Sequence, residues 1–209
     1  MTPNPDSTYT DRVSFILDHT RGKTLDVGYV ACTLHPFIQK EVGIANTFGI
    51  DIEPVPTGYD PAHYKKGSAE SLPFEDNQFD TVTAGELIEH LENPARFVAE
   101  AHRVLKKNGA LILTTPNRKS WVNRAFKSYN TKIHLSLFTP DELQDLLHKN
   151  HFRWSKFVFF PFTEESSPGA SQKWFYPIRA FLHPFMPGAL QEEMAIVALK
   201  LPNTTTNKA

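Results

Sequence analysis

Apolar segments alternate with amphipathic ones along most of the chain. Val13, Ile16 and Leu17 recur at helical spacing and predict a short helix over 11–19, which Gly22 ends. Further helices are predicted at 36–42, at 94–106 and from Pro140 onward, and strands at 24–27, 47–52, 64–67, 79–83, 110–115, 154–162 and 194–199. Strands that alternate with helices predict an α/β fold whose mostly parallel sheet is covered on both faces.

Length and composition indicate a single globular domain. The chain has 209 residues, of which 40% are hydrophobic and 22% charged, so we expect one domain over 11–200, with a flexible lead-in at 1–10 and a flexible tail at 201–209. No apolar stretch predicts a signal core or a membrane span. The single cysteine, Cys32, excludes an internal disulfide and a cysteine-rich zinc site, and it predicts a cytoplasmic location.

The charge balance argues against one class of partner. The formal net charge is −1, so no global positive field attracts the phosphates of nucleic acid. Lys119, Arg124, Lys127 and Lys132 form a local basic stretch that could meet a phosphate or carboxylate group.

The ends of the first two strands carry the first candidate site. The strand at 24–27 ends at Gly28, where the absence of a Cβ lets the backbone approach a ligand closely. The second strand ends in Asp51, about 20 residues further on, where a carboxylate is placed to accept hydrogen bonds from ribose hydroxyls. This pair predicts an adenosine-containing ligand, without choosing between a dinucleotide and S-adenosylmethionine.

Four later segments make that choice. In order they are 67–74 (GSAESLPF), 76–82 (DNQFDTV), 85–94 (GELIEHLENP) and 103–117 (RVLKKNGALILTTPN). This run resembles the class I S-adenosylmethionine-dependent methyltransferases, in particular the small "type 11" group that acts on small molecules. The resemblance covers about 22–160. It implies a Rossmann-like, seven-stranded sheet with one antiparallel strand, 194–199, beside 154–162.

The resemblance also implies S-adenosylmethionine as the cofactor and gives roles to the residues that would bind it. Asp26, Gly28 and Tyr29 match the first motif, which lies against the methionine part of the cofactor. Asp51 matches the ribose-binding acid, and Ile52 would lie against adenine. The remaining matches are Ala69 and Glu70 beside the adenine ring, and Gly85 and Glu86 at the mouth where sulfonium and substrate meet.

Two histidines are the candidate catalytic residues. His90 matches a position near the methionine end of the cofactor or the substrate, and His134 matches a substrate-side histidine of the family. We expect His134, and after it His90, to accept a proton from a hydroxyl acceptor. The histidines lack a spacing such as His-Glu-x-x-His, so no catalytic metal is predicted.

One departure from the family pattern stands in the first motif. Val30 and Cys32 occupy positions where the family usually has glycine. A branched valine could crowd the cofactor, so three outcomes are open: an altered loop that still binds, weak binding, or a protein without catalysis. The first is favoured, because Asp26, Gly28, Asp51 and the 67–117 run are all present.

Simpler readings compete with the site assignments. Asp26 could cap a turn, Asp51 could be a turn residue at a strand end, and His90 could be structural. Glu86, Glu89 and Glu92 could form a solvated helix face, which is the preferred reading for Glu89 and Glu92.

The predicted function is methyl transfer to a small-molecule acceptor, favouring a hydroxyl. One alternative is a non-catalytic binding module, motivated by Val30 and Cys32. Another is a nicotinamide-dependent oxidoreductase, which the missing Gly-x-Gly-x-x-Gly pattern disfavours. The aromatic segment 172–187 is read as part of a lid or insertion at about 163–190, ahead of a membrane-interface or dimer surface, and a homodimer stays open.

Overall fold

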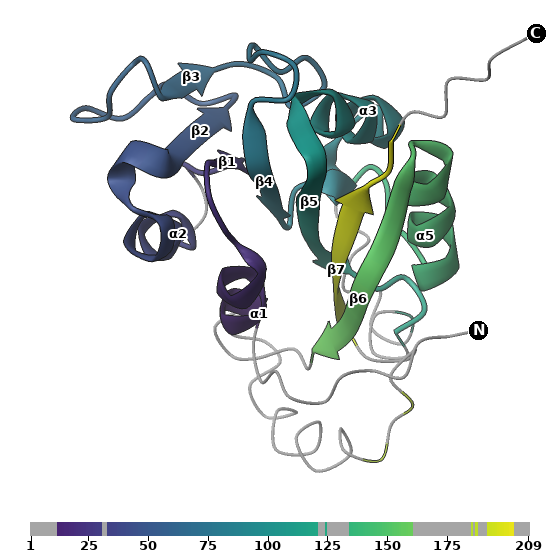
Figure 1. Ribbon diagram of the computed structural model, residues 1–209. Coiled ribbons are helices and arrows are strands. Elements are labelled where there is room, and N and C mark those ends of the chain that lie inside the picture. The colour runs from purple at the N-terminus through teal and green to yellow at the C-terminus, as the bar shows by residue number, and fades with distance from the viewer. Residues whose placement is uncertain are drawn as a thin grey trace, which may run out of the picture.

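The computed structural model describes residues 12–30, 33–120, 124, 134–160, 185, 187 and 192–202. Within these residues, seven strands form one sheet in the order β3-β2-β1-β4-β5-β7-β6 (Figure 1). The strands are β1 (Thr24–Val27), β2 (Thr47–Asp51), β3 (Tyr64–Lys66), β4 (Phe79–Gly85), β5 (Leu105–Pro116), β6 (Phe152–Phe160) and β7 (Glu193–Lys200).

The strand directions confirm the predicted topology. The five strands from β3 to β5 are paired in parallel, whereas β7 runs antiparallel to both β5 and β6 and lies between them. Thr24 of β1 is in register with Thr47 of β2 and Thr81 of β4. Because parallel strands end at the same edge, the residues that follow β1, β2 and β4 gather there, where ligands of open α/β sheets bind.

Helices cover both faces of the sheet and enclose two separate cores. The helices α1 (Arg12–His19) and α2 (His35–Val42) pack on one face, while α3 (Pro94–Val104) and α5 (Pro140–Lys149) pack on the other. Strand β5 serves both, because alternate side chains point to opposite faces. Leu111 and Leu113 join the α3–α5 core, and Ala110 and Ile112 join the α1–α2 core.

Capping residues fix where two helices begin. Thr139 accepts a hydrogen bond from the Glu142 backbone N–H, and the Glu142 carboxylate accepts one from the Thr139 N–H. This reciprocal capping box, with Pro140 in the first turn, places the start of α5 where the sequence predicts it. Asn93 caps α3 in a similar way by accepting from the Arg96 N–H.

The region around Asn108 differs from the prediction. Helix α3 ends at Val104 rather than at 106, and β5 begins at Leu105 rather than at 110. The pairing with β4 shifts register there, and Asn108 has a φ of 61°. The backbone at Asn108 is therefore an irregularity inside a longer strand, stabilised by pairing with β4 that local sequence does not reveal.

Several predictions fall outside the described residues. They concern the lead-in at 1–10, Cys32, the tail beyond 202, and almost all of the aromatic segment 163–190. Of the basic stretch, Lys127 and Lys132 also lie outside. No helix in the described part of the chain is both long and apolar enough to cross a membrane.

Candidate cofactor and acceptor site

A pocket of about 360 Å³ opens beyond the carboxyl ends of β1 and β2. This volume is within the range of roughly 300–1,000 Å³ that is usual for small-molecule sites. Six predicted site residues line it: Gly28, Asp51, Ile52, Ala69, Glu70 and His90. The other lining residues are Val27, Ile50, Gly67, Ser68, Leu87, Leu91 and Glu92. Most of these lie inside the motif segments 67–74 and 85–94. Membership of those segments is the sequence feature that could have identified them as pocket residues.

Gly28 lines the pocket at the end of β1. Its φ is +82°, a conformation that strongly favours glycine, and a Cβ built there would lie 3.1 Å from Cδ1 of Leu87. The Gly28 N–H donates to the Ile50 carbonyl at 2.8 Å, which ties the turn to β2. The backbone at Gly28 is thus held close to the pocket with no side chain in between.

Asp51 orders the loop that follows Gly28. Its Oδ2 accepts a hydrogen bond from the Val30 N–H at 2.9 Å, and its Oδ1 accepts one from the Glu53 N–H at 3.0 Å. Each carboxylate oxygen retains a lone pair for a further donor. Val30 is 37% exposed and is not among the residues that line the pocket.

Asp26 lies beneath the pocket rather than in its wall. It is 1% exposed, and Thr83 Oγ1 donates to its Oδ1 at 2.8 Å while His35 Nδ1 lies 2.8 Å from its Oδ2. His35 Nε2 is 3.0 Å from the hydroxyl of Tyr64, which also accepts from Gln39 at 2.9 Å. No role for His35 is predicted from the sequence, since a histidine in the first turn of a helix carries no local signal.

Tyr29 is also buried away from the pocket. Its ring is packed between His35, Tyr59 and Tyr64, with ring centroids 5.0–5.7 Å apart. Gly49 of β2 makes this possible, because a Cβ there would come within 2.7 Å of both the Tyr29 and Tyr64 rings. Burial, together with the charge of Asp51, raises the pKa of Tyr29 to about 12.

Three glutamates gather at the other end of the site. Burial raises the pKa of the Glu86 carboxyl, and Glu86 adopts a φ of 50° just after β4. Burial and the charge of Glu86 raise the pKa of Glu89 well above its ordinary value. Burial likewise raises the pKa of Glu193 to about 8. Among the described residues, Arg12 forms an ion pair with Glu86, with Nη1 3.9 Å from Oε1.

The prediction that Glu89 lies on a solvated helix face is wrong. Glu89 is 1% exposed, and its Oε2 accepts a hydrogen bond from the Thr115 hydroxyl at 2.9 Å. The reason is local geometry: after the left-handed Glu86, the chain forms the short 3-10 helix η2 (Ile88–His90), which turns Glu89 toward β5. Glu92, in contrast, is exposed as expected.

The two candidate catalytic histidines lie side by side. The rings of His90 and His134 have centroids 4.9 Å apart at an interplanar angle of 47°. The backbone N–H groups of Leu135 and Ser136 donate to the Glu89 carbonyl at 2.8 and 3.0 Å, which fixes the His134 segment against η2. His90 lines the pocket and His134 does not. The contact of His134 with the pocket is therefore indirect, by way of the His90 ring.

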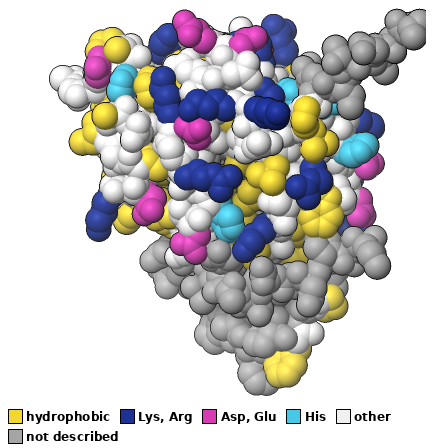
Figure 2. Space-filling model, in the orientation of Figure 1, with side chains coloured by type: hydrophobic (Ala, Val, Ile, Leu, Met, Phe, Trp, Pro, Cys, Tyr) yellow, Lys and Arg dark blue, Asp and Glu magenta, His cyan; other side chains and the backbone are white. Residues whose placement is uncertain are grey.

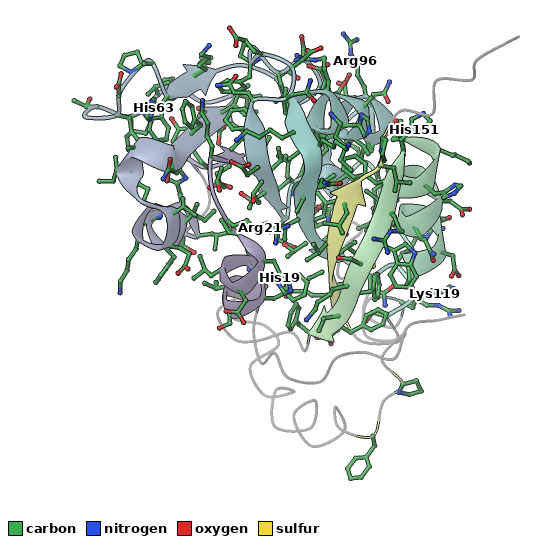
Figure 3. All side chains as sticks on the ribbon, in the orientation of Figure 1. His19, Arg21, His63, Arg96, Lys119 and His151 are labelled. Atoms are coloured by element: carbon green, nitrogen blue, oxygen red, sulfur yellow. The ribbon has the colours of Figure 1, made fainter. Side chains whose placement is uncertain are left out.

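The remaining predicted residues occupy defined positions. Glu70 accepts from the Asn93 N–H at 2.9 Å, so its carboxylate also braces the start of α3. Gly85 and Glu86 follow β4 as predicted but do not line the pocket. Lys119 forms an ion pair with Asp141 (2.7 Å), below α5 in Figure 3. Its charge is therefore already paired.

Other charged groups do not concentrate at one place. His19, His63 and His151 lie on three well-separated parts of the molecule (Figure 3). Basic and acidic side chains are interspersed over the visible face of the described residues (Figure 2), as expected for a net charge of −1.

Comparison with known proteins agrees with this architecture. Residues 25–113 match the methyltransferase domain family. An uncharacterised methyltransferase of Bacillus subtilis, YcgJ, is 30% identical over 104 residues, covering 44% of this chain and 39% of the relative. The ubiquinone biosynthesis O-methyltransferase of Dechloromonas aromatica is 27% identical over 162 residues, covering 66% of this chain and 70% of that protein. The matches to the first four curated relatives span only 29–39% of their lengths.

A solved structure has the same fold. The protein of Thermotoga maritima described as an S-adenosylmethionine-dependent methyltransferase, possible histamine N-methyltransferase, superposes with a TM-score of 0.65 at 21% identity, over 90% of this chain and 89% of that one. The strand order and the antiparallel β7 define an α/β protein of the class I methyltransferase type. The match to the methyltransferase domain family at 25–113 lies within the part of the chain that forms this fold.

Proposed function

We propose that the protein transfers the methyl group of S-adenosylmethionine to a hydroxyl of a small-molecule acceptor. The observation that carries this proposal is the composition of one pocket, whose lining includes Gly28, Asp51 and His90. The first two residues suit the cofactor, and His90 with its neighbour His134 suits the acceptor. The match to the methyltransferase domain family supports S-adenosylmethionine as the cofactor.

The chain's residues fit the cofactor. Asp51 retains lone pairs for the ribose hydroxyls, Ile52 and Ala69 offer apolar surface for adenine, and the bare backbone at Gly28 leaves room that a Cβ would fill. When bound, S-adenosylmethionine supplies a methyl group on a positively charged sulfur, which is already a good leaving group. The protein must then orient the acceptor in line and exclude water.

The two histidines act on the acceptor. An imidazole within hydrogen-bond reach of a hydroxyl accepts its proton as the oxygen–carbon bond forms. We place His90 at the pocket wall and His134 against it, 4.9 Å between ring centroids. A hydroxyl acceptor is supported by relatives that are named as O-methyltransferases of ubiquinone biosynthesis. Methylation of an amine is the outcome that would correct the proposal.

The position of Val30 weighs against the non-catalytic alternative. That reading depends on a valine that crowds the cofactor, whereas the Val30 side chain is exposed and does not line the pocket. We also propose that 11–200 form one methyltransferase domain, and that the single Cys32 reflects a reducing compartment such as the cytoplasm.

Calorimetric titration with S-adenosylhomocysteine tests the proposal. We expect micromolar binding to the full chain and at least tenfold weaker binding to Asp51→Asn. Asp145→Asn, an exposed aspartate on α5, is the matched control and should bind as the parent does. Absence of binding at millimolar ligand would overturn the assignment, and equal affinity in Asp51→Asn would remove Asp51 from the site. Incubation with S-adenosylmethionine and panels of hydroxyl and amine acceptors then identifies the atom that is methylated.

A further inference from the structure

Three side chains that commonly bind metals converge beside the pocket. One ligand atom each from Glu89, His90 and His134 lies within 4.8 Å of the others. Glu89 and His90 are neighbours in η2, and His134 comes from a separate segment between β5 and α5. A search for His-Glu-x-x-His spacing does not detect such a set, which explains why no metal is predicted from the sequence.

The fold holds the carboxylate in one orientation. The Thr115 hydroxyl donates to Glu89 Oε2 at 2.9 Å, and this leaves Oε1 on the side of the imidazoles, 3.9 Å from Nε2 of His90. The hydrogen bonds from Leu135 and Ser136 to the Glu89 carbonyl fix the third ligand beside the other two. Outer-shell hydrogen bonds of this kind orient ligands in metal sites.

The carboxylate of Glu89 lacks a full complement of partners. Its side chain is 1% exposed, and Oε1 accepts no hydrogen bond from any residue that the structure describes. Burying a carboxylate without compensation is strongly unfavourable. Arg12 contacts Glu86 rather than Glu89, and the nearby charge of Glu86 adds repulsion. A bound cation would supply the positive charge that this position lacks.

We propose that Glu89, His90 and His134 bind one divalent transition-metal ion beside the pocket. One carboxylate and two imidazoles form a ligand set of catalytic zinc sites, which keep a further position open. Imidazole ligands favour Zn²⁺ or Fe²⁺ over Mg²⁺. Bonds of about 2.1 Å place ligand atoms about 3.4 Å apart around a tetrahedral ion. The three ligand atoms lie within 4.8 Å of one another, so binding of an ion at that spacing requires the side chains to shift closer, and the His90 side chain is 35% exposed.

The role of the ion rests on the proposed methyl transfer, although the site itself does not. An open coordination position would take the acceptor oxygen and make its hydroxyl more acidic. The histidines are then ligands instead of bases, and the hydroxyl proton passes to solvent. As the oxygen–carbon bond forms, the carbon–sulfur bond breaks and the sulfur keeps its electron pair. The oxidation state of the ion does not change.

Metal titration of the tag-free, chelator-treated full chain tests the site. Mn²⁺ binding is followed by loss of the free-ion electron paramagnetic resonance signal, and Zn²⁺ and Mg²⁺ binding by calorimetry. We expect one Zn²⁺ and one Mn²⁺ per chain, with weaker Mg²⁺ binding. Glu89→Gln and His134→Asn should each weaken Zn²⁺ and Mn²⁺ binding at least tenfold. Glu41→Gln on α2 and His148→Asn on α5, both exposed, should bind as the parent does.

Melting temperature provides a second readout. Zn²⁺ should raise the melting temperature of the parent and leave that of Glu89→Gln unchanged, and the metal-free variant should melt no lower than the metal-free parent. Absence of Zn²⁺ and Mn²⁺ binding at millimolar concentration, or equal affinity in Glu89→Gln, overturns the site. Titration of the same metal-free protein with S-adenosylhomocysteine separates the two proposals. Binding of S-adenosylhomocysteine without metal binding overturns only the proposed metal site. Metal binding without binding of S-adenosylhomocysteine overturns only the proposed methyl transfer.

Discussion

His35 and Asp26 form a buried pair at the end of β1, next to the candidate pocket. Nδ1 of His35 lies 2.8 Å from Oδ2 of Asp26, and each residue is 1% exposed. Because a carboxylate only accepts, Nδ1 must donate, and Nε2 is then the acceptor for the Tyr64 hydroxyl. This chain of hydrogen bonds connects the end of β1 to α2 and β3, the elements that frame the first-motif loop.

Replacement of His35 by leucine should destabilise the protein strongly. The substitution leaves the buried Asp26 carboxylate with Thr83 as the one side-chain donor among the described residues, and removing a hydrogen-bond partner from a buried charged group costs about 1–3 kcal/mol or more. Urea denaturation followed by circular dichroism measures the free energy of unfolding. His148→Leu, at an exposed position, should change it by less than about 0.5 kcal/mol. A similar small change for His35→Leu would show that the pair contributes little.

Replacement of Gly49 by alanine should also lower stability. The new Cβ would lie within 2.7 Å of the Tyr29 and Tyr64 rings, and overpacking of this kind costs about 1–3 kcal/mol. Gly85→Ala is the matched control, because its Cβ would make only ordinary contacts of 3.6 Å or more. Thermal unfolding of the two variants should therefore differ clearly. Equal melting temperatures would mean that the tyrosine rings can move apart.

Val30→Gly restores the glycine that the family usually has, and it should not improve cofactor binding. The Val30 side chain is exposed and lies outside the pocket wall, so we expect the dissociation constant for S-adenosylhomocysteine to change less than about threefold, or about 0.7 kcal/mol. The added backbone freedom should lower stability by about 0.5–1 kcal/mol. A large gain in affinity would show instead that valine crowds the cofactor.

His102 should make stability decrease in mild acid. Burial lowers the pKa of His102 in the folded protein below its ordinary value of 6.5. Well above pH 6.5 His102 is neutral in both the folded and the unfolded state and adds no pH dependence. As the pH falls from 6.5 toward the folded-state pKa, the unfolded chain binds more protons, so stability is lost.

Chemical denaturation between pH 7.5 and 5 measures this effect. His102 packs edge-on against Phe152 at 5.3 Å, so His102→Gln keeps much of the volume and removes the titration. The variant should lose less stability than the parent over this range. Parallel curves for the two proteins would exclude His102 as a source of the pH dependence.

The sequence by itself determined the order of elements and most of the pocket wall. Gly28, Asp51, Ala69 and Glu70 follow strands or lie in compact motifs, and parallel strands necessarily end at one edge. The start of α5 was equally local, since Thr139 and Glu142 cap it through contacts three residues apart.

Only the tertiary structure decided which side chains are buried and which meet across the chain. Glu89 appeared to be a solvated residue because the charge pattern around it is helical, but the turn at Glu86 directs it to Thr115 on β5. Likewise, His35 acquires its role from Asp26 and Tyr64, and His134 reaches His90 through a segment held on η2. Such pairings depend on long-range packing, whose register no local pattern encodes.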